Sequence, residues 1–191
     1  MQISIISGRA GSGKSVCLHV LEDYGFYCID NLPTSLLPSL IEQIHPHQSR
    51  VAVSIDARNS PTDLDQFAHV ISELKKTANH CEIIFFDAEE SVLLKRFSET
   101  RRKHPLSSNK ISLKEALHRE IELLEPIAHL ADLRVDTSRL SVQQLRVLVR
   151  DRILPQTECP GLSLLFQSFG YKFGVPLDAD FVFDTRCLAN P

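Results

Sequence analysis

The feature that most constrains this chain is a glycine-rich octapeptide placed between two strongly patterned segments. Residues 8–15 spell Gly-Arg-Ala-Gly-Ser-Gly-Lys-Ser and match the pattern G-x-x-x-x-G-K-[ST] at every fixed position. The apolar run Ile3 to Ile6 precedes them, and an amphipathic stretch from Lys14 to Asp23 follows. This order of strand, loop and helix is the one that a phosphate-binding loop requires.

The residue types explain how such a loop holds phosphate. Its glycines allow backbone conformations that side chains would block, so that successive N–H groups turn inward, and the helix adds the positive end of its dipole. We expect Lys14 to neutralise phosphate charge and the Ser15 hydroxyl to ligate Mg²⁺. The residues predicted to hold the phosphates of ATP or GTP are Gly8, Arg9, Ala10, Gly11, Ser12, Gly13, Lys14 and Ser15. The alternative is a glycine-rich turn with an accidental lysine.

Short apolar runs alternate with stretches of helical period through most of the chain. The predicted strands are residues 1–7, 26–29, 50–56, 82–87 and 132–136. The predicted helices are residues 14–23, 33–44, 63–76, 89–100, 112–129 and 141–153. The continuous apolar run Ile83 to Phe86 is typical of a strand covered on both faces. Residues 1–154 are therefore predicted to form a three-layer α/β domain with a parallel sheet, of the kinase-like P-loop NTPase kind.

The pattern changes at Pro155. Residues 155–161 contain two prolines and a glycine and are predicted to be a linker. Beyond them, Leu162 to Phe169 and Phe181 to Phe183 have the composition of strands, and no convincing helix follows. We expect residues 162–191 to be the beginning of an incomplete C-terminal α/β domain.

Composition narrows the class of protein. The 191 residues are 43% hydrophobic and 24% charged, as in a globular protein, and the net charge of -3 does not indicate nucleic-acid binding by the molecule as a whole. The five cysteines include no C-x-x-C pair, and the N-terminus lacks the charged region of a secretory signal. No apolar run approaches the roughly 20 residues that span a bilayer. We expect a cytoplasmic protein with free thiols and no membrane partner.

An acid at the end of a neighbouring strand usually completes a P-loop site by holding the shell of the metal. Asp30, Asp56 and Asp87 each end a predicted strand, where the ligand crevice of this architecture lies. We favour Asp56 as the Mg²⁺-side acid and as the third catalytic residue beside Lys14 and Ser15; its alternative role is a turn or helix cap. Asp30 either caps the next helix or binds a second substrate, and Asp87 is predicted to be a cap.

A basic segment lies between two predicted helices, where Arg101, Arg102, Lys103 and His104 are consecutive. It is either a lid whose arginines close on phosphate or a patch for RNA backbone, so we name Arg101, Arg102 and His104 as candidate anion-binding residues. The alternative is a solvated helix end, where basic residues favour the negative pole of the dipole. The eight histidines show no paired-ligand spacing, which argues against a zinc site.

Several blocks beyond the glycine-rich loop resemble one family, the RapZ/YvcJ nucleotide-binding proteins. The blocks are Leu21 to Pro33, Val53 to Asn59, Thr100 to Ser108, Leu123 to Pro126 and Phe169 to Asp184. Many families share the loop, whereas Asp-Asn-Leu-Pro, Arg-Arg-x-His-Pro-Leu and Asp-Ala-Asp-x-Val-Phe-Asp are far more specific together. With the loop, the matching blocks cover the whole chain in order.

The resemblance implies a domain that binds ATP and GTP and hydrolyses them weakly. ATP is taken by the loop, and GTP is assigned to Asp56, Ala57, Arg58 and Asn59. Family members also bind small regulatory RNAs and present them to an endoribonuclease, which controls the synthesis of glucosamine-6-phosphate. They run longer, through a domain with a basic tail and a phosphosugar-binding site, and we expect that longer form to be a homo-oligomer.

Three classes of function remain open. The leading hypothesis is a nucleotide-responsive regulatory adapter with weak ATPase or GTPase activity. The alternative is a small-molecule kinase that uses the same loop with Asp30 and a lid containing Arg101 and Arg102. The third class is a scaffold with a vestigial loop, for which nucleotide would change neither partner binding nor thermal stability.

Overall fold

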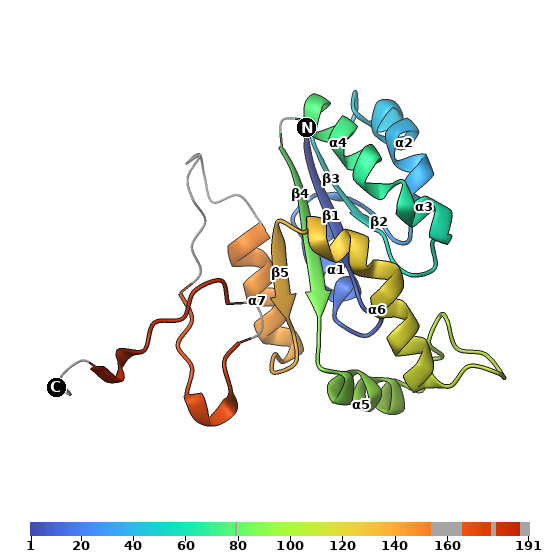
Figure 1. Ribbon diagram of the computed structural model, residues 1–191. Helices are drawn as coiled ribbons and strands as arrows, with labels where there is room; N and C mark the ends of the chain where they lie inside the picture. The colour runs from blue at the N-terminus through green and yellow to red at the C-terminus, as the bar shows by residue number, and fades with distance from the viewer. Residues whose placement is uncertain (79, 154–165, 177–178, 188–191) are drawn as a thin grey trace.

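The computed structural model describes residues 1–78, 80–153, 166–176 and 179–187. Within them lies a parallel sheet with the strand order β2-β3-β1-β4-β5. The strands are β1 (Gln2–Gly8), β2 (Tyr27–Ile29), β3 (Arg50–Ser54), β4 (His80–Asp87) and β5 (Leu133–Asp136). Because β1 is the central strand, the glycine-rich loop that follows it opens at the middle of the carboxyl edge of the sheet (Figure 1).

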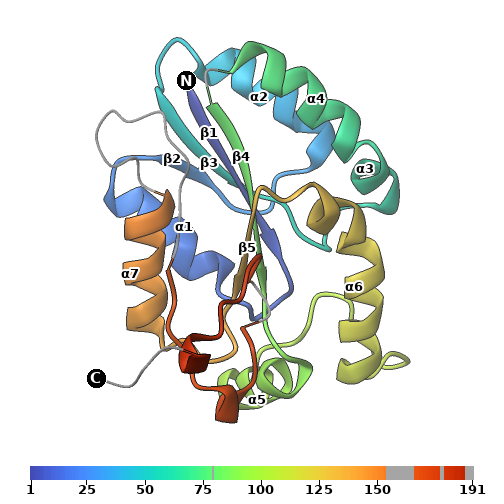
Figure 2. The same ribbon diagram turned by 60° about the vertical axis from the view of Figure 1, so that its left-hand side comes forward.

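Helices cover both faces of the sheet (Figures 1 and 2). One face carries α1 (Lys14–Asp23) and α7 (Val142–Ile153), whose apolar side chains share a core. The other face carries α2 (Leu37–Ile44), α3 (Pro61–Asp65), α4 (Phe67–Thr77) and α6 (Leu113–Leu130). Helix α5 (Glu90–Thr100) lies beyond the carboxyl ends of the strands. The predicted three-layer α/β architecture is confirmed.

The two cores meet at the central strands. On β4, Ile83 and Phe85 pack into the core beneath α4 and α6, whereas Ile84 and Phe86 pack into the core beneath α1 and α7. All four side chains are buried. Since consecutive strand residues point to opposite faces, the unbroken apolar run is what a strand covered on both sides needs.

Two predicted helices are divided. The helix predicted at 33–44 begins with the 3₁₀ turn η1 (Thr34–Leu36), and the helix predicted at 63–76 is split between α3 and α4 at Gln66. Helix α3 also begins earlier than predicted, because the Ser60 hydroxyl accepts a hydrogen bond from the Asp63 N–H and Pro61 occupies the first turn. Among the described residues, every helix is too short or too polar to cross a membrane.

The segment after α7 differs from the prediction. The linker at 155–161 and residues 162–165 of the first predicted strand lie outside the described residues. The strand predictions are wrong for residues 166–169 and 181–183, which join no β-ladder with a described residue. Phe181 and Phe183 are 82% and 83% exposed, so their apolar side chains have no sheet face to cover. The described part of this segment contains the 3₁₀ turns η2 (Tyr171–Phe173) and η3 (Thr185–Cys187).

Gly8, at the end of β1, lies so close to the backbone of β4 that we expect its substitution to destabilise the fold strongly. Its φ is +136°, and a Cβ built on it would lie 2.0 Å from the carbonyl oxygen of Phe86. At Gly11, φ is +84° and the Cβ would lie 3.5 Å from the Leu93 side chain. We expect Gly8→Ala to lower the free energy of unfolding by about 3 kcal/mol or more, and Gly11→Ala by about 1 kcal/mol. Urea denaturation measures both, and equal losses would contradict the geometry.

Candidate functional site

The glycine-rich loop leaves β1 and runs directly into α1. Its glycines all have positive φ: +136° at Gly8, +84° at Gly11 and +109° at Gly13. The first hydrogen bond of α1 runs from the Cys17 N–H to the Gly13 carbonyl over 3.1 Å. The N–H groups of Lys14 and Ser15 therefore precede the helical ladder and are free to bind an acceptor. This is the geometry of an anion site at a helix N-terminus.

The amides in the first half of the loop are already engaged. The Arg9 N–H donates to the Phe86 carbonyl over 3.1 Å, which extends the β1–β4 pairing by one residue. The Ala10 N–H donates to Glu120 Oε1 over 2.9 Å, and the Ser12 N–H donates to the Arg9 carbonyl over 3.1 Å. The anion-binding face of the loop is consequently its second half, where α1 begins.

Lys14 lies folded against the loop. Its ammonium donates to the carbonyl oxygens of Gly8, over 2.6 Å, and Arg9, over 3.0 Å. Burial lowers the pKa of Lys14, and the nearby carboxylates of Glu120 and Asp56 oppose this effect only in part. Phosphate oxygens would be stronger acceptors for this ammonium than the two neutral carbonyls.

Ser15 and Ser12 differ in their surroundings. Ser15 is exposed at the first turn of α1, and its hydroxyl makes no hydrogen bond with a described residue. Ser12 is buried, and its carbonyl accepts a hydrogen bond from the Thr137 hydroxyl over 2.8 Å. Of the two hydroxyls, that of Ser15 is the one available to a metal ion.

Glu120 of α6 links the loop to the basic segment. While its Oε1 accepts from Ala10, its Oε2 lies 3.2 Å from His104 Nε2. The Leu106 N–H donates to His104 Nδ1 over 3.1 Å, which places the proton of a neutral imidazole on Nε2, where it is donated to Glu120. Both side chains are at most 1% exposed. The carboxylate thus bridges the loop backbone and the residue that anchors the basic segment.

The basic segment is divided by this contact. His104 was predicted to contact an anion together with Arg101 and Arg102, but it is buried against a carboxylate and a ring of Phe97. The imidazole is buried and its Nε2 is paired with Glu120, so the ring cannot reach a phosphate. Arg101 and Arg102 are exposed and make no ion pair with a described residue. Only the two arginines keep the predicted role.

Sequence reasoning missed Glu120, although a signal was present. The residue occupies a core position in the apolar row of α6, whose other members are Ala116, Leu117, Leu124 and Ile127. A carboxylate at the period of an apolar helix face must be paired when that face is buried. The partner could not be found from spacing, because Ala10 is 110 positions away in the sequence.

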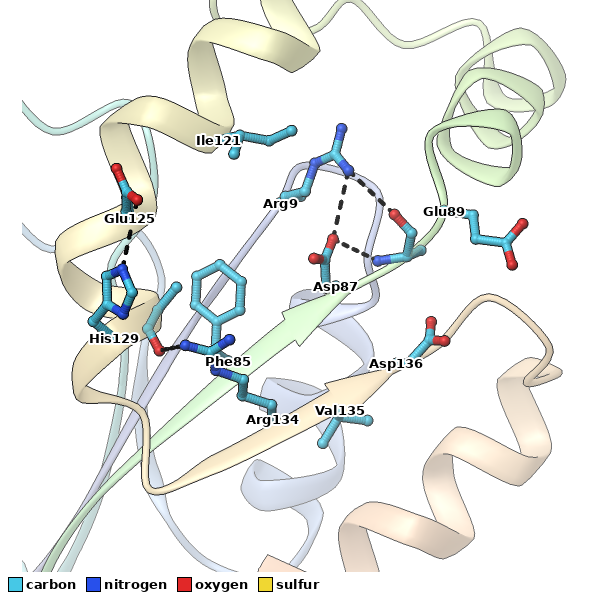
Figure 3. Close-up of a pocket in the computed structure, with 12 residues that line it drawn as sticks. Arg9, Phe85, Asp87, Glu89, Ile121, Glu125, His129, Arg134, Val135 and Asp136 are labelled. Carbon is cyan, nitrogen blue, oxygen red and sulfur yellow. Dashed lines mark hydrogen bonds and ion pairs between the residues drawn. The ribbon is translucent and has the colours of Figure 1, made fainter. Parts of the chain in front are cut away.

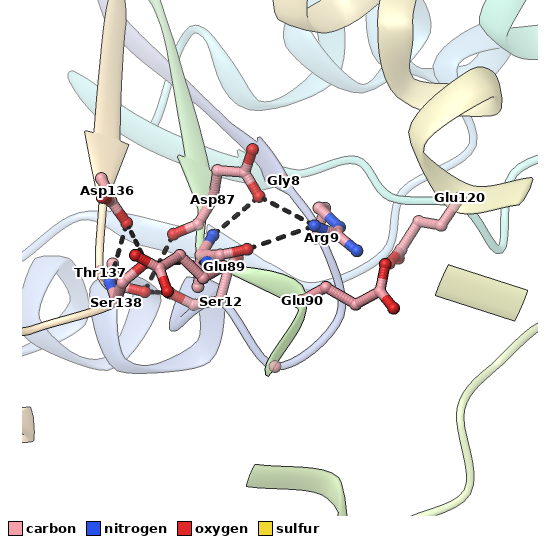
Figure 4. A network of polar contacts seen from close by, with 12 residues as sticks. Gly8, Arg9, Ser12, Asp87, Glu89, Glu90, Glu120, Asp136, Thr137 and Ser138 are labelled. Atoms are coloured by element: carbon pink, nitrogen blue, oxygen red, sulfur yellow. Dashed lines mark hydrogen bonds and ion pairs between the residues drawn. The ribbon is translucent and has the colours of Figure 1, made fainter. Parts of the chain in front are cut away.

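Arg96 of α5 was also missed. Its guanidinium donates to the Gly11 carbonyl over 2.9 Å, to the Thr137 hydroxyl over 3.0 Å and to the Thr137 carbonyl over 2.6 Å. Figure 4 shows Thr137 beside Ser12 in the polar network at the ends of β4 and β5. The outer turn of the loop is therefore braced by α5 and by the residues that follow β5.

Asp56 lies where we expected an acid, directly beyond β3. The Ile55 N–H donates to the Ile6 carbonyl over 3.0 Å, so β3 ends beside the start of the loop. Asp56 Oδ1 accepts from the Arg58 N–H and Nε, both over 3.0 Å, and Oδ2 accepts from Arg58 Nη2 over 2.7 Å. Burial raises the pKa of Asp56, but Arg58 and Lys14 outweigh it and hold that pKa below its ordinary value.

The rest of the predicted GTP segment is unequally accessible. Ala57 and Asn59 are buried, and Asn59 Oδ1 accepts from the Thr34 N–H over 2.9 Å. The side chain of Arg58 is 42% exposed and also lies 3.4 Å from Asp30 Oδ2. Arg58 is therefore the member of this segment that can reach a ligand, while Asn59 ties the segment to η1.

The donor set suits Mg²⁺ in its chemistry. A serine hydroxyl and a carboxylate are the hard oxygen donors that this cation prefers. Ser15 offers an unpartnered hydroxyl, and Asp56 keeps a charged carboxylate whose oxygens have lone pairs beyond those used by Arg58. Asp56 would accordingly hold the metal through its water shell, or after Arg58 has moved.

Comparison with protein families gives two matches along this chain. The RapZ-like N-terminal domain matches residues 1–157, and the RapZ C-terminal domain matches residues 162–191. The chain belongs to the RapZ-like family. A nucleotide-binding protein of Nitrosococcus oceani is 57% identical, with all of this chain and 68% of the relative aligned. A nucleotide-binding protein of Pseudomonas fluorescens is 54% identical over the same shares.

Solved structures place the RapZ-like fold among kinase-like P-loop proteins. A sugar kinase from Janibacter has a TM-score of 0.54 and 17% identity over 79% of this chain and 93% of its own. Shikimate kinase from Acinetobacter baumannii has a TM-score of 0.52 and 13% identity over 80% of this chain and 93% of its own. At these identities the likeness concerns the fold.

The buried pair of His104 and Glu120 in this RapZ-like chain can be tested by mutation. We expect His104→Ala to lower the free energy of unfolding by about 3 kcal/mol, because it leaves the Glu120 carboxylate buried without its second partner. The exposed neighbour Lys103 provides the control, and Lys103→Ala should change stability by no more than about 0.5 kcal/mol. Urea denaturation compares the two variants. A loss no larger in His104→Ala than in the control would show that the pair does not hold the loop.

Proposed function

We propose that this chain binds ATP or GTP, with Mg²⁺, on the loop Gly8 to Ser15 and acts as the nucleotide-responsive part of a RapZ-like regulatory adapter. The observation that carries the proposal is the second half of the loop. There, the N–H groups of Lys14 and Ser15 lie at the N-terminus of α1 ahead of its first helical hydrogen bond, and the Lys14 ammonium lies on the carbonyl oxygens of Gly8 and Arg9 in the same loop. The family and the kinase-like fold support nucleotide as the ligand.

Nucleotide binding would rearrange contacts that the structure already shows. Lys14 exchanges its bonds to the Gly8 and Arg9 carbonyls for bonds to phosphate oxygens, since a charge-assisted hydrogen bond is the stronger one. The α1 amides bind the same phosphates. Mg²⁺, when bound, supplies positive charge between phosphate oxygens, and Ser15 with Asp56 would hold it.

Weak hydrolysis is consistent with the state of Asp56. A general base must accept a proton from water, and its efficiency falls with its pKa. Arg58 donates to both carboxylate oxygens of Asp56 and helps to keep the pKa of Asp56 low, so this residue is a poor base. We therefore propose slow ATPase or GTPase turnover, suited to sensing nucleotide rather than to consuming it.

The GTP assignment and the RNA role extend the proposal by family resemblance. For GTP, exposed Arg58 is the candidate contact within residues 56–59. For RNA, Arg101 and Arg102 are exposed cations on the basic segment, which His104 anchors to the loop through Glu120. We propose that the whole adapter, as a homo-oligomer in the cytoplasm, presents a small regulatory RNA to an endoribonuclease and so controls glucosamine-6-phosphate synthesis.

One observation favours the second candidate function, a small-molecule kinase. Asp30, Arg58 and Asp56 form a row of charges at the carboxyl edge of the sheet, with 3.4 Å and 2.7 Å between the guanidinium and the two carboxylates. Such a row can bind a polar acceptor. A screen of metabolites for phosphoryl acceptance separates the functions, because a kinase turns over faster on an acceptor than on water.

Lys14→Ala tests nucleotide binding directly. We expect it to weaken ATP binding by at least about tenfold, because it removes a charge-assisted hydrogen bond to phosphate. Titration calorimetry with Mg²⁺ measures the affinity. Lys110→Ala, which removes one exposed lysine between α5 and α6 and outside the four consecutive basic residues, should leave it unchanged. Absent binding in the parent chain, or equal affinity in Lys14→Ala, would defeat the proposal and favour the scaffold.

Asp56→Asn tests the metal side of the site. We expect the gain in ATP affinity produced by Mg²⁺ to fall about tenfold, because outer-shell carboxylates typically contribute that much to metal affinity. The exposed carboxylate of Asp65 on α3 serves as control through Asp65→Asn. Calorimetric titrations with Mg²⁺ and with a chelator measure the gain. The same Mg²⁺ gain in both variants would remove Asp56 from the metal site.

A further inference from the structure

A cavity that the nucleotide proposal does not use lies on the other side of Arg9. It has a volume of about 470 Å³ and lies between α6 and the ends of β4 and β5 (Figure 3). This volume falls in the range of roughly 300–1,000 Å³ that is usual for small-molecule sites. The cavity is lined by both charged and apolar side chains, so its chemistry can be read from them.

One of the residues that line the cavity is a buried cation, Arg9. The side chain of Arg9 is 7% exposed, and its Nη1 donates to the Ala88 carbonyl over 3.2 Å. Its Nε and Nη2 are buried and have no hydrogen-bond partner among the described residues. Unpaired N–H groups of a buried guanidinium are costly, so an acceptor that entered the cavity and reached them would be bound favourably. A carboxylate is the acceptor that fits two adjacent guanidinium N–H groups best.

Two carboxylates also line the cavity. Asp87 and Asp136 are register partners at the ends of β4 and β5. Asp87 Oδ1 accepts from the Ala88 N–H and lies 3.6 Å from Arg9 Nη1, and Asp136 Oδ1 accepts from Ser138. The Oδ2 atom of each aspartate makes no hydrogen bond with a described residue. Partial burial is the main cause that raises the pKa of Asp87, and the neighbouring Asp136 carboxylate adds to it, while the Ala88 N–H and the Arg9 guanidinium oppose the rise.

The remaining lining is mixed, because Glu89, Glu125, His129 and Arg134 also contribute to it. Its apolar part, which we call the apolar wall, consists of Phe85 and Val135 on the sheet and Ile121 and Ala128 on α6. Phe85 and Val135 are buried, whereas Ile121 is 46% exposed although it lies on a helix that packs on the sheet. An exposed isoleucine at the side of a cavity is available to contact a ligand.

We propose that this cavity binds a free α-amino acid with an apolar side chain, its carboxylate on Arg9 and its ammonium on Asp87 and Asp136. This class is favoured because the cavity is lined both by a guanidinium with unpaired N–H groups, that of Arg9, and by the Oδ2 atoms of Asp87 and Asp136, which make no hydrogen bond with a described residue. The side chain of the ligand lies on the apolar wall. Since Arg9 belongs to the glycine-rich loop, the ligand would contact that loop.

Binding of L-phenylalanine and of its two halves tests this assignment without any nucleotide. Phenethylamine lacks the carboxylate, and hydrocinnamate lacks the amino group. We expect L-phenylalanine to bind with a Kd below about 1 mM, and each half to bind at least about tenfold more weakly, since each loses one charge-assisted contact. Protein NMR titration measures all three. No saturable binding, or a half that binds as tightly as the amino acid, would overturn the proposal.

Three variants locate the site. Ile121→Trp should fill the cavity and abolish binding, whereas Leu130→Trp, at an exposed position on the same helix away from the cavity, should retain it. Asp136→Asn keeps the shape of the side chain and should remove the advantage of L-phenylalanine over hydrocinnamate. Binding that survives both Ile121→Trp and Asp136→Asn would place the ligand elsewhere. Because the readout is binding of an amino acid alone, it is independent of the outcome for ATP.

Discussion

The conformation of the glycine-rich loop depends on contacts that distant parts of the chain make with its backbone. Glu120 of α6 accepts from the Ala10 N–H, Arg96 of α5 donates to the Gly11 carbonyl, and Thr137 donates to the Ser12 carbonyl. Three separate elements therefore hold three consecutive residues of the loop. Because these contacts order the loop before any phosphate binds, binding does not have to order it, and the entropic cost of binding is lower.

The buried carboxylate sets the electrostatics of the site. Glu120 is almost completely buried, so its charge must be balanced by hydrogen bonds, and it takes them from His104 and from the loop itself. The same charge supports the Lys14 ammonium, which burial would otherwise tend to neutralise. One carboxylate thereby contacts the loop backbone, opposes the fall in the pKa of Lys14 and anchors His104 of the basic segment.

The features that could be predicted from the sequence are those that a local pattern of residues determines. The glycine-rich loop between a strand and a helix, the apolar strand that is covered on both faces and Asp56 beyond β3 follow from residue types and spacing, and the structure has them. The Glu120 contact depends on residues far apart in the chain, so no local pattern could predict it. His104 was predicted to contact an anion because its neighbours are basic, but in the structure it is buried and paired with Glu120. Phe181 and Phe183 have strand-like composition but pair with no described strand edge.

The most direct test of this account is a crystal structure of the chain with a non-hydrolysable ATP analogue and Mg²⁺. The account predicts that the Lys14 ammonium leaves the carbonyl oxygens of Gly8 and Arg9 for the phosphates, which also accept from the Lys14 and Ser15 N–H groups. The bond between Glu120 and the Ala10 N–H should persist. Phosphates bound elsewhere, with Lys14 still on the loop carbonyls, would contradict the account.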